Sequence, residues 1–313
     1  MQTVPSVRFT ARSALSRNNP RRKAVTEAFI TGGLLNAKEP LQRNGGANLC
    51  RRFYTSNEER MIPLIHSFLL IGQSNMAGRG FVHEAEPIQN PHIKVLRNGR
   101  WQPMYVPVNC DRPFSGINLA ESFADCYQKE HGVDVGLIPC ADGGTTISQW
   151  KKGSLLYDHA LYQAELAQRT STLCGVLWHQ GESDCEKTLY PLYKERFRAF
   201  LTDLIQDLNL NDVPFLAGGL GDFLAHCPLN ASLANYTIIN QAIKQVTEEF
   251  STAGFVPADG LTSNPDQLHF NAQSLREFGV RYYRAFQKLE NQNRVFPEKP
   301  CEDDAVRTGL EWM

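Results

Sequence analysis

The chain has 313 residues, of which 42% are hydrophobic and 21% charged, proportions that are ordinary for a globular enzyme. Its formal net charge of −1 is unevenly distributed: residues 1–60 hold eleven Lys and Arg against four Asp and Glu, and the remainder is acidic. An acidic body without a basic stripe argues against a nucleic-acid partner. No apolar run has the length of a membrane span, so no membrane-spanning helix is expected either.

The first 60 residues differ from the rest of the chain. Six Lys and Arg precede the first acidic residue, Glu27, among scattered Ser, Gly and Asn. This composition suits an organelle-targeting leader, and it suits equally a disordered or non-native extension. We prefer the extension, because Met61 stands just ahead of the first apolar run. The sequence therefore predicts a single folded domain over residues 61–290, followed by a polar tail over 291–313.

The eight cysteines contain no Cys-x-x-Cys pair, so neither a zinc site nor a redox pair is indicated. Reduced thiols in a cytoplasmic protein are the simplest interpretation. An organelle is the alternative location, if residues 1–60 act as a transit peptide.

From Met61 onward, strand-like and helix-like segments alternate. Strands are expected at 66–72, 93–96, 133–139, 174–178, 213–217 and 255–256. Helices are expected at 117–131, 155–168, 190–208, 233–250 and 271–289, with a loop at 103–113. This alternation predicts a three-layer α/β/α sandwich around a parallel sheet. Because parallel strands end at one edge, the polar turns at 72–80, 140–146 and 179–184 are expected to face one crevice.

The polar turn after the first strand carries a candidate nucleophile. An apolar run ends at Gly72, and Ser74 follows in a turn at the carboxyl edge of the predicted sheet. Backbone amides at the start of a following helix would be free to stabilise an oxyanion. A lone serine here is better explained as the cap of an ordinary strand-to-helix turn, so the catalytic interpretation depends on partners elsewhere in the chain.

A candidate base lies just before the last helix. His269 follows Asp266 by three residues, a spacing that lets the carboxylate reach the imidazole Nδ1 while Nε2 faces outward. Alone, this pair is more simply a capped turn beside a surface histidine. Combined with Ser74 and the two other polar turns, it predicts nucleophilic serine chemistry.

The turn at 179–184 has a metal-binding alternative. His179, Glu182, Asp184 and Cys185 are all ligand types, but their spacing follows no standard motif. We therefore expect a hydrogen-bonded turn and no metal. Trp178 and Phe270 are expected in the core, whereas Arg79 and Trp150 are candidates for lining a pocket.

Three segments together resemble the SGNH hydrolase superfamily. They are the Gly-Gln-Ser-Asn-Met-Ala-Gly run at 72–78, the Trp-His-Gln-Gly-Glu-Ser-Asp run at 178–184, and Asp266-x-x-His269-Phe270. Within that superfamily they are similar to carbohydrate esterase family six and the sialate O-acetylesterase-like domain, over about residues 62 to 288. The resemblance implies a flavodoxin-like three-layer sandwich and a metal-independent esterase, without a cofactor, that removes acetyl groups from sugars.

The resemblance also implies a role for each matched residue. Ser74 would be the nucleophile, His269 the general base and then acid, and Asp266 its orienting carboxylate.

The oxyanion donors implied by the resemblance are the Ser74 amide, an amide in Gly143-Gly144, and the Gln180 side chain. The wider superfamily uses asparagine where this chain has Gln180. Supporting or substrate-contacting roles are expected for Gln73, Asn75 and Glu182.

The sequence thus predicts a serine esterase that removes O-acetyl groups from a small-molecule or carbohydrate ester, of acetylxylan or sialate type, through an acyl-enzyme. A broader lipase- or thioesterase-like acyl hydrolase is one alternative, which the lack of a long apolar lid disfavours. A non-catalytic sugar-binding module is another, and the joint presence of Ser74, Asp266 and His269 argues against it.

Overall fold

The computed structural model describes residues 65–293, so the expected extension at 1–60 and most of the expected tail lie outside the described residues. Within this range the strands are β1 Ile65–Gly72, β2 Ile93–Arg97, β3 Arg100–Pro103, β4 Asp134–Pro139, β5 Thr172–His179, β6 Phe215–Gly218 and β7 Ala253–Val256. The α-helices in the same range are α1 Ser74–Ala77, α2 Ala120–His131, α3 Leu155–Gln168, α4 Tyr190–Leu208, α5 Tyr236–Thr247 and α6 Ala272–Asn293. None of the helices in this part of the chain has both the length and the apolar character needed to cross a membrane.

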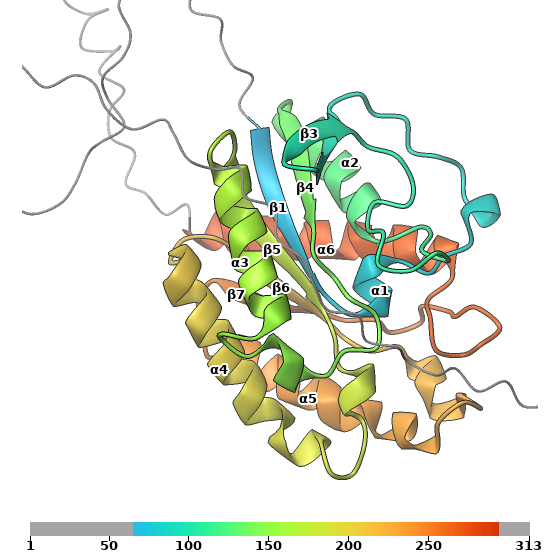
Figure 1. The fold of residues 1–313 in the computed structure, drawn as a ribbon. Coiled ribbons are helices and arrows are strands. Elements are labelled where there is room, and N and C mark those ends of the chain that lie inside the picture. Colours follow the sequence, from blue (N-terminus) through green and yellow to red (C-terminus); the bar gives the residue numbers. More distant parts are fainter. Residues whose placement is uncertain (1–64, 294–313) are drawn as a thin grey trace, which may run out of the picture. The chain divides into compact units, whose positions relative to one another are not determined.

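The strands form one sheet in the order β3-β2-β4-β1-β5-β6-β7 (Figure 1). Every neighbouring pair is parallel except β2 and β3. The segment β4-β1-β5-β6-β7 has the flavodoxin-like order, and β2 and β3 extend the sheet beyond β4. The predicted three-layer sandwich is therefore confirmed, with one antiparallel strand at an edge.

Strand β1 lies inside the sheet and is buried on both faces. Phe68 and Leu70 pack with α2 and α6, whereas Leu69 and Ile71 belong to the core beneath α3, α4 and α5. Figure 1 shows α3 and α4 on one side of β1 and α6 on the other. Because successive strand residues face opposite layers, a strand covered by helices on both sides must be apolar throughout. This explains the unbroken apolar run that precedes Ser74.

Several element ends lie a few residues from their expected positions, and two of the differences have a visible local cause. Strand β3 was not predicted, although Asn98 and Gly99 carry the signal for it: both have positive φ, 51° and 70°, as a two-residue hairpin turn requires. Helix α2 starts at Ala120, three residues later than expected, because Ile117 instead forms a β-bridge with Gly80 and the Asn118 side chain accepts the Ala120 amide.

The helix ends follow local chemistry that the sequence shows. Gly132 takes the left-handed conformation at the end of α2, with φ 66°. The Asn271 side chain accepts the Ser274 amide at 2.8 Å and caps the start of α6, as expected.

The topology brings three polar turns together. Since β1 lies between β4 and β5, the turns that follow these strands are neighbours at the carboxyl edge of the sheet. The Gln73 amide donates to His179 O at 2.8 Å, and the Asp142 amide donates to Gly72 O at 3.0 Å. The expected crevice therefore lies where β1 meets β5, the point at which the strand order reverses.

Gly72 is the residue that lets β1 and β5 end this close together. Its φ is 130°, and an added Cβ would lie 2.1 Å from His179 O. We expect Gly72→Ala to lower the free energy of unfolding by clearly more than the roughly 1–2 kcal/mol that left-handed strain alone costs.

Gly132→Ala is the matched control, because Gly132 has φ 66° and open space around its Cβ position. Urea unfolding of both variants measures the difference. Equal losses of unfolding free energy in the two variants would contradict a close approach of the His179 backbone to Gly72.

Candidate active site

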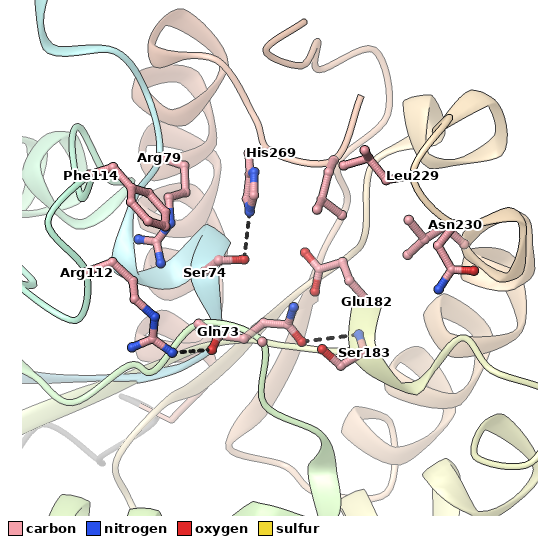
Figure 2. A pocket seen from close by; sticks show the side chains of 14 residues that line it. Gln73, Ser74, Arg79, Arg112, Phe114, Glu182, Ser183, Leu229, Asn230 and His269 are labelled. Atoms are coloured by element: carbon pink, nitrogen blue, oxygen red, sulfur yellow. Dashed lines mark hydrogen bonds between the residues drawn. The ribbon is translucent and has the colours of Figure 1, made fainter. Parts of the chain in front are cut away.

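Three residues predicted to act together lie in contact. Ser74 is the first residue of α1, directly after β1, and His269 lies in the loop before α6. The Ser74 Oγ is 3.1 Å from His269 Nε2, and His269 Nδ1 is 2.7 Å from Asp266 Oδ2. Figure 2 shows the imidazole pointing down at the serine hydroxyl. The arrangement is that of a serine nucleophile, a base and an orienting carboxylate.

The turn from Asp266 to His269 holds the carboxylate in place. Asp266 Oδ1 accepts the Leu268 amide at 2.9 Å and the His269 amide at 3.0 Å. Burial alone would raise the pKa of Asp266, but these hydrogen bonds and the imidazole outweigh it and hold the pKa below its ordinary value. An ionised carboxylate keeps the proton on Nδ1 and leaves Nε2 free to accept the serine proton.

Asn75 connects the nucleophile turn to the histidine loop. Its Oδ1 accepts the Phe270 amide at 3.1 Å, and its Nδ2 donates to Leu268 O at 3.3 Å. The backbone on both sides of His269 is thus bonded to the residue that follows Ser74. Nδ2 also donates to the buried Glu182 Oε1 at 2.5 Å. Asn75 and Glu182 therefore support the site. The Asn75 side chain holds the loop of His269 against the turn of Ser74.

Gln73 links the nucleophile turn to the turn after β5. Its Oε1 accepts the Gln180 side chain at 3.2 Å, the Gly181 amide at 3.3 Å and the Ser183 amide at 3.5 Å, the last drawn in Figure 2. It also lines the pocket in front of Ser74.

The expectation that the Gln180 side chain donates to the oxyanion is wrong. Gln180 is fully buried, and its Nε2 lies within hydrogen-bond distance of three acceptors. These are Gln73 Oε1, Thr145 O at 2.9 Å and Asp184 Oδ2 at 2.6 Å. Two amide hydrogens already face three acceptors, so none is available to a substrate. Gln180 instead joins the turns after β1, β4 and β5.

The backbone amides of Gly143 and Gly144 differ, because one donates a hydrogen bond within the protein and the other is free. The Gly143 amide donates to Asp111 Oδ2 at 2.9 Å, so of the two amides expected as oxyanion donors it is not the free one. The amides of Ser74 and Gly144 have no hydrogen-bond acceptor within residues 65–293. Both residues line the same pocket, and these amides remain available as donors.

A buried ion pair that the sequence did not predict lies beside Ser74. Arg79 Nη1 and Nη2 bind Asp111 Oδ1 and Oδ2 at 3.1 and 2.6 Å, and both side chains are only 5% exposed. Burial alone would raise the pKa of Asp111, but hydrogen bonds from Arg79, Ser115 and the Gly143 amide lower it below its ordinary value. Asp111 is therefore ionised, and it accepts a hydrogen bond from the Gly143 amide.

The loop that carries Asp111 is anchored to the turn after β4. The Asn109 side chain exchanges hydrogen bonds with the backbone of Ala141, and Arg112 Nη2 donates to Gly143 O at 2.9 Å. Arg112 also pairs with Asp142 at 2.9 Å. In the sequence, Asp111 and Arg112 are two adjacent charged residues between prolines. This pattern is too weak to assign them to the site.

A pocket of about 340 Å³ opens in front of Ser74 and His269. Phe114 and Leu229 flank its mouth and are 68% and 66% exposed. Figure 2 places Phe114 with Arg79 on one side and Leu229 with Asn230 on the other. The rest of the lining comes from Gln73, Arg112, Gly143, Gly144, Glu182, Ser183, Leu233 and Leu268.

The three aromatic side chains singled out in the sequence all lie in the core. Trp178 and Phe270 are fully buried, which confirms their expected core positions. Trp150 is also fully buried, and it donates from Nε1 to Thr145 Oγ1 at 3.1 Å, so it belongs to the core rather than the pocket.

His179 and its neighbours form a hydrogen-bonded turn. The His179 imidazole is fully buried beside Gly219 O, and burial lowers its pKa. In the part of the chain that the structure describes, no three His, Cys, Asp or Glu side chains gather as metal ligands would. The six cysteines in this part are free thiols.

This fold and site can be compared with known proteins. Residues 65–288 match the family described as carbohydrate esterase, sialic acid-specific acetylesterase. The chain belongs to this carbohydrate esterase family. It is therefore a hydrolase of carboxylic ester bonds, and the expected resemblance to the sialate O-acetylesterase-like branch is confirmed.

Relatives of the esterase include a protein of Arabidopsis thaliana named probable carbohydrate esterase, 28% identical over 254 residues, which span 72% of this chain and 91% of that protein. The crystal structure of the same plant protein has a TM-score of 0.64 and 26% identity, covering 72% of this chain and 98% of the other.

Two further structures share the fold at lower identity. NanS has a TM-score of 0.59 at 16% identity, covering 74% of this chain and 99% of NanS. A carbohydrate acetylesterase from Xanthomonas citri has a TM-score of 0.56 at 18% identity, covering 72% of this chain and 57% of that protein.

The contacts of Gln180 predict a structural role. Gln180→Met keeps the volume but leaves Thr145 O without this donor and Asp184 Oδ2 with the Ile147 amide alone, so we expect the free energy of unfolding to fall by about 1–3 kcal/mol. Urea unfolding measures it. Unchanged stability together with a large loss of turnover would instead restore Gln180 as an oxyanion donor.

The lowered pKa of Asp111 predicts a pH-dependent stability. The unfolded chain takes up this proton near the ordinary value of 3.8, and the folded chain takes it up only at lower pH. The ionised carboxylate therefore stabilises the fold fully above pH 3.8, and this contribution is lost as pH falls towards the folded-state pKa.

At neutral pH we expect Asp111→Asn to cost roughly 3–5 kcal/mol, because it leaves the buried Arg79 charge unpaired. The gap between wild type and variant is expected to narrow below pH 3.8. Urea unfolding between pH 7 and pH 3 measures it, and a constant gap would rule out a lowered Asp111 pKa.

Proposed function

We propose that the esterase removes O-acetyl groups from carbohydrates through a covalent acyl-enzyme on Ser74. The observation that carries this proposal is the hydrogen-bonded line from Ser74 Oγ through His269 to Asp266, at 3.1 and 2.7 Å. These distances are those at which a base accepts a proton from its nucleophile and is oriented by a third group.

In the first half-reaction, Ser74 Oγ attacks the acetyl carbonyl while its proton passes to His269 Nε2. The carbonyl oxygen becomes an oxyanion that binds the amides of Ser74 and Gly144, which are without a backbone acceptor among the described residues and belong to residues that line the pocket. When the tetrahedral intermediate collapses, the sugar oxygen leaves with the proton from His269.

In the second half-reaction, a water molecule gives its proton to His269 Nε2 and attacks the acetyl-Ser74 carbonyl. Acetic acid leaves and ionises in water, and the proton on His269 returns to Ser74 Oγ. Asp266 stays ionised throughout and stabilises the imidazolium that forms twice in each cycle, in accordance with its lowered pKa.

The shape of the pocket supports a small acyl group on a larger, polar alcohol. Its volume of about 340 Å³ is at the small end of ligand pockets. Its exposed mouth has apolar side chains, Phe114 and Leu229, beside polar ones, Arg112 and Asn230. Such a mixed rim suits a sugar, whose ring presents both C–H faces and hydroxyl groups.

Steady-state hydrolysis of p-nitrophenyl acetate tests the proposal. We expect Ser74→Ala to lower kcat by at least roughly 10⁴-fold, because the acyl-enzyme no longer forms. Ser67→Ala is the matched control: Ser67 is buried on the same strand, bonds Thr172 O at 3.1 Å, and is expected to leave kcat within a few-fold. Equal rates for wild type and Ser74→Ala would overturn the serine mechanism.

Two substrate series then identify the ester. p-Nitrophenyl esters of increasing acyl length distinguish an acetylesterase from the lipase-like alternative, which predicts a preference for long chains. Release of acetate from acetylated xylan and from O-acetylated sialic acid, measured side by side, separates the two sugar classes.

A further inference from the structure

The mouth of the pocket carries two apolar side chains that the core does not use. Phe114 and Leu229 are 68% and 66% exposed. Within residues 65–293 they are the two exposed large apolar side chains that line the pocket of Ser74 and His269. Apolar side chains exposed singly are ordinary on a protein surface. Two that border one pocket indicate a ligand with an apolar face.

Phe114 projects from a closed turn. It lies in the segment 111–115 between β3 and α2, where the Ser115 amide donates to Arg112 O at 3.1 Å. The Ser115 hydroxyl donates to Asp111 Oδ1 at 2.8 Å and accepts the Arg112 amide at 3.2 Å. The backbone on both sides of Phe114 is thus held by hydrogen bonds within the turn. The ring is presented to the pocket from a fixed position.

Arg79 holds one face of the Phe114 ring. The central carbon of its guanidinium lies 5.2 Å from the ring centroid, and the guanidinium is itself bound by both oxygens of Asp111. Because the ring is mostly exposed, its other face is open to a ligand. A side chain that is already oriented loses little conformational freedom when a ligand binds to it.

Leu229 lies on the other side of the mouth and is held as well. Figure 2 shows Leu229 and Asn230 across the pocket from Phe114, with Ser74 between them. The Asn230 side chain donates to Glu186 Oε1 at 2.9 Å and accepts the Ser232 amide at 2.9 Å. A ligand that reaches Ser74 therefore passes between two apolar side chains whose backbones are anchored.

A pyranose ring has the chemistry that this mouth requires. Its C–H groups form apolar faces with a slight positive charge, and these pack well against the negative face of an aromatic ring. Its hydroxyl groups project from the ring edge, where the polar side chains of Arg112, Ser183 and Asn230 line the same pocket. An open-chain alcohol has hydroxyl groups but no such face.

We infer that Phe114 is a specificity-determining residue of this esterase, an inference that rests on the proposed function. Its ring stacks on a C–H face of the pyranose that carries the acetyl group, and Leu229 packs against that sugar from the other side of the mouth. The contact is made by the alcohol part of the ester, away from the bond that breaks. It is therefore equally strong before and during attack by Ser74, and it lowers KM for sugar esters without changing kcat.

Steady-state acetate release from two esters tests the inference. One is methyl β-xylopyranoside with a single acetyl group, and the other is glycerol monoacetate, which has free hydroxyl groups but no ring. We expect Phe114→Ala to raise KM for the sugar ester about 5- to 10-fold, with kcat within about twofold of wild type. KM for glycerol monoacetate is expected to stay within about twofold, because it makes no stacking contact. Phe114→Tyr keeps the flat ring and is expected to keep the wild-type KM, whereas Phe114→Leu is expected to lie between Phe114→Ala and wild type.

Tyr105→Ala is the matched control. Tyr105 is a 52% exposed aromatic residue in the same connection between β3 and α2, and it lies over the guanidinium of Arg97 at 3.7 Å. It does not line the pocket of Ser74, so KM for both esters is expected to remain within about twofold of wild type. Thermal unfolding by circular dichroism checks the fold of each variant. Phe114→Leu serves if Phe114→Ala is not folded.

Three results would overturn the inference alone: an unchanged KM for the sugar ester in Phe114→Ala, an equal rise in KM for both esters, or the same rise in Tyr105→Ala. A wild-type chain that hydrolyses glycerol monoacetate but no acetylated sugar would overturn the proposed function instead, so the two failures are distinguishable.

Discussion

The structure of the site depends on one hydrogen bond between residues 195 positions apart, from Ser74 to His269. No local interaction can produce it. The sheet brings the nucleophile turn to its carboxyl edge, α6 brings the histidine loop to the same edge, and Asn75 bonds the backbone on either side of His269. A displacement of about 1 Å in either loop would weaken proton transfer, so rigid support is part of the chemistry.

That support is a set of buried polar side chains beneath the pocket. Gln73, Gln180 and Asp184 join the turns after β1, β4 and β5 through hydrogen bonds to one another and to the backbone of Thr145 and Ile147. Polar groups taken out of water are stabilising only when their hydrogen bonds are satisfied, which makes such a network specific for one arrangement of the turns. Gln73, Gln180 and Asp184 thus form the floor of the site, and the pocket lies above them.

The Arg79–Asp111 pair has a different effect, because it places two charges beside the reacting atoms. Asp111 accepts the Gly143 amide, and Arg79 pairs with the same carboxylate at 2.6 Å. Since both side chains are buried, their fields are weakly screened and their positions scarcely change with solvent. The pair therefore joins the turn that carries Ser74 to the loop that carries Asp111.

The layers of the fold, and the side chains that meet at its carboxyl edge, could be read along the chain. Buried parallel strands must be apolar, and helices must carry one apolar face, so the sandwich could be predicted along the chain, together with Ser74, Asp266 and His269 at its turns. The hairpin strand β3 was missed, although its Asn98-Gly99 turn was visible.

Which polar atoms remain free for a substrate depends on contacts between distant parts of the chain. Gln180 and Gly143 match the expected donors in the sequence, yet buried acceptors from Thr145, Asp184 and Asp111 take up their hydrogens. Arg79 and Asp111 are 32 positions apart, and no periodicity connects them. Hydrogen bonds are made between neighbours in space, and a motif records which groups are present without recording which of them are already bonded.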